Sequence, residues 1–209
     1  MRREGLECLN YFPNEALPYM MISLPMLVEE NYAGAKGYLV KGLELAPENS
    51  FIKSQLYAYL GECYYKQDSV DIAFSMFDSA IAINPNDIMT LNNYSYYLSL
   101  RNERLDYAEK MISAALSADP NNATFLDTYA WVLFKLKNYS LARFYMRSAM
   151  ENTTEPSGVL YEHYGDILYM NGDKEEALKM WKKALELGDD ISDDLKNKIE
   201  NGLSVEHEE

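Results

Sequence analysis

In one stretch of the chain, apolar side chains recur at spacings of three and four residues. Large and small apolar residues return in this way from Tyr57 to Tyr64, and again from Ala73 to Ala80. The spacing predicts two amphipathic helices, and Asp68 between them belongs to a residue type that caps helix N-termini. The chain has only 10 glycines and 7 prolines, which favours helices over a turn-rich β fold.

The small residues of this stretch return three more times toward the C-terminus. Ala73, Ala108, Ala142 and Ala177 are separated by 35, 34 and 35 residues (108 − 73, 142 − 108 and 177 − 142). Other small residues keep nearly the same steps: Ala80, Ala115, Ala149 and Ala184, and Gly61, Ser95, Ala130 and Gly165. A looser copy lies upstream, where Ala35 precedes Ala73 by 38 residues (73 − 35). Because small side chains permit close approach of a partner helix, the repeat predicts a series of packed helix pairs.

The best-defined copy resembles the tetratricopeptide repeat, whose pattern joins W-x2-L-G-x2-Y to A-x3-F and a closing proline. The matching residues are Tyr57, Leu60, Gly61, Tyr64, Ala73, Phe77, Ala80 and Pro85. The resemblance implies an all-α fold, namely a right-handed α-solenoid of about five helix pairs with a C-terminal capping helix. The expected segments are a lead-in at 1–15, a helical-repeat array at 16–190 with repeats at about 16–49, 50–87, 88–122, 123–156 and 157–190, a capping helix at 191–204 and a tail at 205–209.

The two ends of the array have different patterns. Near the C-terminus, apolar side chains recur every four residues, at Ile191, Leu195, Ile199 and Leu203. This predicts a capping helix with a narrow apolar stripe, for which Ser192 is the expected N-cap. Near the N-terminus, the run 17–28 is apolar nearly all round, which indicates a buried helix. Residues 1–14, upstream sequence or a second subunit are three ways to cover that helix.

Each predicted first helix carries a second stripe beside its core stripe, at positions i, i+4 and i+7. In proteins that this chain resembles, the first helices line the concave side of the superhelix, so the stripes are expected to line one groove. The expected protein-binding groove residues are Glu62, Tyr65, Asn92, Tyr96, Asp127, Trp131, Phe134, Glu162, Asp166 and Tyr169. Tyr and Trp often anchor interfaces, and carboxylates favour a ligand with Lys or Arg. We therefore expect a partner protein or peptide with basic or aromatic residues.

The same residue types also suit a purely structural role. Trp131 and Phe134 fit packing against neighbouring helices equally well, and the carboxylates fit a solvated face. Trp181 takes the bulky second-helix position and is expected in the core. Some relatives grip the C-terminal carboxylate of heat-shock chaperones with lysines, asparagines and an arginine. Among the corresponding positions only Asn93 is of a suitable type, and Glu62 would repel a carboxylate, so this activity is not expected.

Charge and composition exclude several classes of site. The net charge of −14 argues against nucleic acid and against anionic membrane surfaces, because both are bound through Lys and Arg. Cys8 and Cys63 are far apart, and His163 has no nearby Cys or His, so neither a disulfide nor a metal site is expected. No nucleotide-binding or hydrolase motif occurs, so we expect no cofactor and no catalytic site.

Two functions remain open from the sequence. The first is a non-catalytic protein–protein interaction scaffold that holds a peptide segment or partner protein in the groove. The second is a structural or assembly component that self-associates through its apolar N-terminal end, as an exported bacterial envelope protein would. The sequence has no evident signal peptide and no apolar run of about twenty residues. A cytoplasmic location is expected as the sequence stands, and a periplasmic or exported one if a leader precedes it.

Overall fold

The computed structural model describes residues 2–188 and 191–203, and this part of the chain contains helices and no strand. The helices are α1 (Arg2–Tyr11), α2 (Ala16–Val28), α3 (Tyr32–Leu45), α4 (Phe51–Lys66), α5 (Val70–Ile83), α6 (Ile88–Arg101), α7 (Leu105–Ala118), α8 (Ala123–Lys135), α9 (Tyr139–Asn152), α10 (Gly158–Met170), α11 (Lys174–Leu187) and α12 (Leu195–Asn201). The predicted all-α class is confirmed. None of these helices combines the length and the apolar character that crossing a membrane requires.

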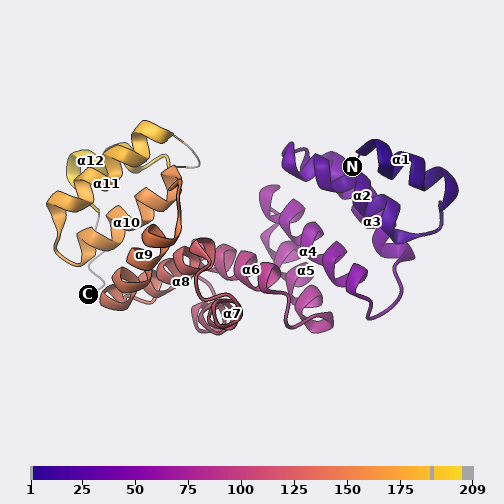
Figure 1. The fold of residues 1–209 in the computed structure, drawn as a ribbon, viewed down its shortest axis with the longest axis horizontal. Helices are drawn as coiled ribbons and strands as arrows, with labels where there is room; N and C mark the ends of the chain where they lie inside the picture. The colour runs from indigo at the N-terminus through magenta and orange to yellow at the C-terminus, as the bar shows by residue number, and fades with distance from the viewer. Residues whose placement is uncertain (1, 189–190, 204–209) are drawn as a thin grey trace. The chain divides into compact units, whose positions relative to one another are not determined.

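The chain forms two compact units, Met1–Tyr94 (unit 1) and Ser95–Glu209 (unit 2), which we describe separately. In unit 1, consecutive helices from α1 to α5 pack side by side, and α2 also contacts α4 (Figure 1). Ile22, Leu39 and Leu56 are fully buried between them. A Cβ atom on Gly61 would lie 2.9 Å from the ring of Phe77. The small residue of the first helix therefore permits the close α4–α5 contact that the repeat predicted.

Helix α1 covers part of the apolar helix at the N-terminal end. Gly5 lies so close to α2 that a Cβ atom would approach Cγ1 of Ile22 to 2.8 Å, and Leu9 packs on the unit 1 core. Of the three covers that the sequence left open, the chain's own N-terminal segment is the one observed. The cover is incomplete, because Leu17 and Val28 remain 48% and 85% exposed.

In unit 2, consecutive helices from α7 to α12 pack against each other, and α8 also contacts α10. The repeated alanines at Ala142, Ala149, Ala177 and Ala184 are fully buried, as their small size requires. Trp181 is 2% exposed, so its predicted core position is confirmed. Its indole lies directly over Gly165, where there is no room for a Cβ atom.

The turns between paired helices differ from the predicted capping. Asp68 does not cap α5, because it adopts a left-handed conformation with φ of 56°. Glu30, Lys137 and Gly172 take the equivalent turn position, two residues before α3, α9 and α11, with φ of 56°, 61° and 92°. The turns before α3, α5, α9 and α11 therefore share a left-handed residue at this position, and of these four helices only α3 also has a side-chain cap, from Asn31 to the backbone N–H of Gly34.

The C-terminal cap is also shorter than predicted. Helix α12 begins at Leu195 with Asp194 as its N-cap residue, so the prediction that Ser192 caps it is wrong. Ser192 instead donates hydrogen bonds from its backbone N–H and its hydroxyl to the carboxylate of Glu162 on α10. Residue 204 of the expected capping helix and the expected tail at 205–209 lie outside the described residues.

Candidate protein-binding site

The structure divides the ten expected groove residues into two groups. Six keep part of their surface in solvent: Glu62, Tyr65, Tyr96, Asp127, Phe134 and Tyr169. Four are buried: Asn92, Trp131, Glu162 and Asp166. The stripe that the helical spacing predicted is therefore only partly exposed to solvent, because other side chains of the protein cover the four buried residues.

In unit 2, Trp131 lies inside a stack of aromatic rings. Its indole is parallel to the imidazole of His163, with 3.9 Å between ring centroids, and the ring of Phe134 lies on it at 4.8 Å. His163 is fixed by Asp127, whose Oδ1 lies 2.9 Å from Nδ1 of the imidazole. Trp131 is only 6% exposed, and its Nε1 has no hydrogen-bond partner. Of the two sequence interpretations of Trp131, packing is therefore the one observed.

Glu162 and Asp166 are buried because α12 lies on them. Lys198 donates from Nζ to Oε1 of Glu162 and to Oδ2 of Asp166, each at 2.7 Å, and Trp181 donates from Nε1 to Oδ1 of Asp166 at 2.8 Å. Burial raises the pKa of Glu162, but the hydrogen bonds from Lys198 and Ser192 outweigh it, so this pKa lies below its ordinary value. Burial lowers the pKa of Lys198, but the two carboxylates outweigh it and raise this pKa. Both directions indicate an ion pair that the chain itself completes.

Unit 1 has an open pocket in the corresponding region. The pocket has a volume of about 260 Å³. It is lined by Phe51, Gln55, Ala58, Tyr59 and Glu62 of α4, Phe77 of α5, Asp87, and Met89, Thr90 and Asn93 of α6. We call it the α4–α6 pocket. Two of its apolar side chains, Phe51 and Met89, are 69% and 55% exposed, so its rim is apolar while its interior carries two carboxylates.

The carboxylate of Glu62 is the charged group of this pocket that has no direct hydrogen-bond or ion-pair partner among the described residues. Burial raises the pKa of Glu62, and the charge of Lys66 one turn later opposes this only in part. Burial and the negative charges of Asp87 and Glu62 also raise the pKa of Tyr59, so these three groups share one electrostatic environment. A cation that entered the pocket would relieve the cost of burying Glu62.

The second carboxylate of the pocket is held in place by neighbouring residues. Asp87 accepts hydrogen bonds from Nε2 of Gln55 and from the hydroxyl of Thr90, the latter at 2.8 Å. Its Oδ1 also accepts from the backbone N–H of Met89 at the start of α6, at 3.2 Å. Asp87 is therefore a fixed, satisfied wall of the pocket, whereas Glu62 is unsatisfied.

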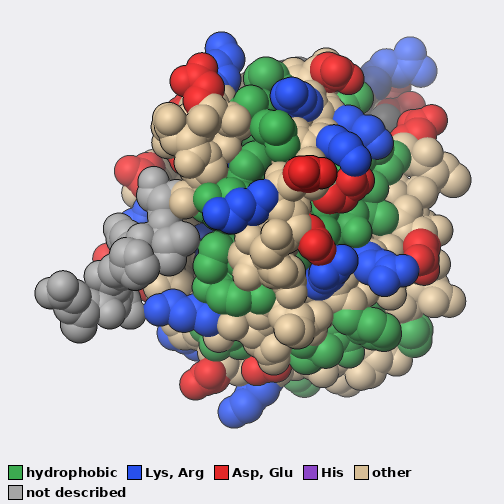
Figure 2. Space-filling view, turned by 90° about the vertical axis from the view of Figure 1, so that its left-hand side faces the viewer, with side chains coloured by type: hydrophobic (Ala, Val, Ile, Leu, Met, Phe, Trp, Pro, Cys, Tyr) green, Lys and Arg blue, Asp and Glu red, His purple; other side chains and the backbone are tan. Residues whose placement is uncertain are grey.

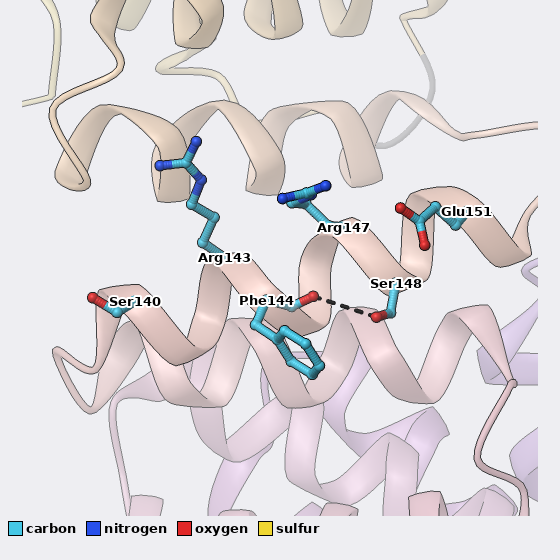
Figure 3. A pocket seen from close by; sticks show the side chains of 6 residues that line it. All are labelled: Ser140, Arg143, Phe144, Arg147, Ser148 and Glu151. Carbon is cyan, nitrogen blue, oxygen red and sulfur yellow. Dashed lines mark hydrogen bonds between the residues drawn. The ribbon is translucent and has the colours of Figure 1, made fainter.

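A second hollow, on α9 of unit 2, is lined mainly by basic rather than acidic side chains. It has a volume of about 400 Å³ and is lined by Ser140, Arg143, Phe144, Arg147, Ser148 and Glu151. The guanidinium groups of Arg143 and Arg147 point to one side of α9 and the ring of Phe144 to another (Figure 3). Arg143 is paired with Asp173 at 2.6 Å. This hollow has no unsatisfied buried group among its lining residues, so it is the weaker of the two candidates.

On the one face that Figure 2 shows, the acidic side chains do not form a continuous surface. On the face of unit 2 in Figure 2, acidic, basic and hydrophobic side chains are interspersed. Within residues 2–188 and 191–203, no three His, Cys, Asp or Glu side chains are grouped as metal ligands. Burial raises the pKa of the fully buried Cys63 thiol to about 12, so this thiol stays protonated at neutral pH.

Comparison with known proteins places the fold. No protein-family model matches the sequence, and no curated protein matches it. The solved structure of MamA, residues 41 to the end, from Desulfovibrio magneticus RS-1 is 18% identical with a TM-score of 0.66, covering 84% of this chain and 97% of that one. PilF of Pseudomonas aeruginosa is 19% identical with a TM-score of 0.68, covering 91% of this chain and 79% of that one.

A third solved structure is YrrB, described as a TPR protein with an unusual peptide-binding site. It is 16% identical with a TM-score of 0.65, covering 91% of this chain and 95% of that one. MamA, PilF and YrrB are all tetratricopeptide-repeat proteins. The chain therefore has the tetratricopeptide-repeat fold, as the sequence pattern predicted.

Proposed function

We propose that this protein is a non-catalytic scaffold that binds a segment of a partner protein in the α4–α6 pocket. The segment presents a basic side chain to Glu62 and an apolar or aromatic side chain to the pocket rim. The single observation that carries the proposal is the half-buried, unpaired carboxylate of Glu62 inside a pocket that is open to solvent. The similarity of the fold to YrrB, a TPR protein with a peptide-binding site, supports the same class of function.

The pocket suits a basic side chain for a physical reason. A carboxylate that has lost part of its hydration gains more from a charge-assisted hydrogen bond than one in bulk water. The exposed ring of Phe51 and the thioether of Met89 supply apolar contact beside that charge, and methionine adapts readily to different partner shapes. Tyr65, another expected groove residue, lies on the same helix, α4, and stacks on Phe74 with ring centroids 6.3 Å apart.

The test uses the full chain and four pools of fluorescently labelled twelve-residue peptides. The pools have Lys, Arg, Gln or Leu at one central position and the same apolar neighbours, and binding is followed by fluorescence anisotropy. We expect the Lys or Arg pool to bind at least about tenfold more tightly than the Gln pool, and Glu62→Gln to abolish this preference. Glu44→Gln is the matched control, because Glu44 is exposed on α3 and paired with Lys41. Equal binding of the four pools, or an unchanged preference in Glu62→Gln, would overturn the proposal.

A second candidate function is self-association through the N-terminal end. It is favoured by the exposure of Tyr11, Phe12 and Val28, which are 80%, 56% and 85% exposed. Light scattering over a range of protein concentrations tests it. A mass that rises with concentration, and that falls to the monomer value in Phe12→Ser, supports self-association, whereas a constant monomer mass rejects it.

A further inference from the structure

The α4–α6 pocket corresponds, by the internal repeat, to the region of unit 2 where Lys198 of α12 lies on α10. We infer that this pocket is a binding site for a lysine side chain, an inference that rests on the proposed function. A lysine of the partner protein places its ammonium group in this pocket. In unit 2, the equivalent ammonium group is that of the chain's own Lys198.

The correspondence follows from the register of the repeat. Glu162 and Asp166 lie one turn apart on the first helix α10, and Lys198 follows them by 36 and 32 residues (198 − 162 and 198 − 166). Ala58 and Glu62 lie one turn apart in the same way on the first helix α4. Glu62 is therefore the repeat equivalent of Asp166.

The α8–α10 pair repeats the same offsets with different chemistry. His163 follows Asp127 by 36 residues and Trp131 by 32 (163 − 127 and 163 − 131), and it contacts both side chains. In unit 2, one side chain of α10 thus contacts two residues of α8, and one side chain of α12 contacts two residues of α10. The same kind of contact therefore occurs at two successive steps of the array in unit 2.

In the α4–α6 pair, the equivalent position on the next first helix is Asn93, which lines the pocket together with Ala58 and Glu62. Asn93 follows Ala58 by 35 residues (93 − 58), one fewer than in the later pairs. Its side chain is shorter than that of lysine and carries no charge, and no hydrogen bond joins it to Glu62. Lys198 lies on Asp166, whereas Asn93 and Glu62 both line an open pocket of about 260 Å³.

The neighbouring polar groups are those that an ammonium needs. An ammonium group donates three hydrogen bonds and accepts none. Glu62 offers an unpaired acceptor. Asn93 lines the same pocket, and its Oδ1 already accepts a hydrogen bond at 3.0 Å from Nδ2 of Asn92, which is not a lining residue. Asp87 supplies a second negative charge in the wall of the pocket.

The test compares three peptides that differ at one position, which is lysine, acetyl-lysine or arginine, on the full chain. Their common sequence is that of the peptide in the lysine pool that binds most tightly. We expect acetylation to weaken binding at least about tenfold and arginine to bind more weakly than lysine, because the repeat equivalent of this site in unit 2 holds the compact ammonium group of Lys198.

A variant then fills the site from within. In Asn93→Lys the new amine takes the place of the partner's, so we expect this variant to lose binding at least tenfold and to melt at a higher temperature than wild type. Asn93→Gln, which adds length without charge, is the control and keeps the lysine preference. The acetyl-lysine comparison needs no variant, so it decides the question even if Asn93→Lys does not fold.

The outcomes separate this inference from the proposed function. Loss of binding in Glu62→Gln with full binding in Asn93→Lys, or with equal affinity for lysine and arginine, overturns the lysine site and leaves the basic-segment scaffold intact. Binding that is unaffected by Glu62→Gln overturns both. Loss of binding in Asn93→Lys together with sensitivity to acetylation supports the lysine site.

Discussion

Nζ of Lys198 lies 2.7 Å from Oε1 of Glu162, and this hydrogen bond joins the C-terminal helix α12 to the first helix α10. The same ammonium reaches Asp166, so one buried amine serves two buried carboxylates. The stability of the end of unit 2 therefore depends on one side chain of a seven-residue helix.

Replacement of Lys198 by methionine should destabilise the protein by about 3–5 kcal/mol, because it leaves Glu162 and Asp166 buried without a counter-charge. Urea unfolding followed by circular dichroism measures this loss. Lys196→Met is the matched control: Lys196 is exposed on the same helix, and its replacement should change the stability by no more than about 0.5 kcal/mol. Equal stabilities of the two variants would contradict the ion-pair assignment.

The low pKa of Glu162 makes part of this stability dependent on pH. A carboxyl group whose pKa is lower in the folded than in the unfolded chain stabilises the fold above its unfolded pKa, and this contribution is lost as the pH falls below it. We therefore expect the contribution of Glu162 to the stability to decrease as the pH falls from the ordinary value of 4.5 toward the lowered one, whereas burial raises the pKa of Asp166, whose contribution changes in the opposite sense. In Glu162→Gln this part of the pH dependence should be absent. A thermal-unfolding series in matched buffers checks the difference in slope.

The glycines in the helices differ sharply in what an added methyl group would meet. Gly165→Ala should cost about 1–3 kcal/mol, because a Cβ atom has no room beneath the indole of Trp181. Gly37→Ala is the control within a helix, since Gly37 is exposed on α3 and nothing lies within 4 Å of its Cβ position. That substitution should stabilise the protein by up to about 1 kcal/mol, because alanine favours helix. Denaturant titrations of both variants test the contrast, and a neutral Gly165→Ala would contradict the close packing.

The sequence predicted the fold because close helix packing requires small residues at fixed spacings along the chain. Gly61 and Gly165 had to be small, and their neighbours on the second helices had to be bulky, so the pattern was readable without contacts. The predicted N-cap at Asp68 was wrong, because one residue type can serve two local roles. Asp68 suggested an N-cap by its residue type, whereas the tight turn uses its tolerance of left-handed backbone.

The site was harder to predict, because its residues meet only across helix pairs. His163 has no Cys or His near it in the sequence, and no motif marks Lys198, yet the two occupy one repeat position and contact Trp131, Glu162 and Asp166. A helical wheel places a stripe on one face of one helix, but it does not show which residue of the next helix lies on that face. The offset of 36 residues, read along the repeat, was the signal that could have identified both.

Glu62 should reduce the stability of the protein at neutral pH. Burial raises its pKa, so the folded chain holds the proton more tightly than the unfolded chain does. The ionised group therefore costs stability at pH 7, and this cost disappears as the pH falls through the raised pKa. We expect Glu62→Gln to be more stable than wild type at pH 7 and the difference to vanish as the pH approaches 4.5.

Urea unfolding at a series of pH values measures this difference, with Glu44→Gln as the exposed control that should stay within about 0.5 kcal/mol of wild type. A Glu62→Gln variant that is less stable than wild type at pH 7 would mean that the carboxylate is satisfied within the free protein. The outcome also bears on function, because a residue that costs stability in the free chain and gains a partner on binding is retained for the binding it provides. Addition of the tightest lysine peptide should then stabilise wild type and leave Glu62→Gln unchanged, since a ligand that binds only the folded state raises its stability.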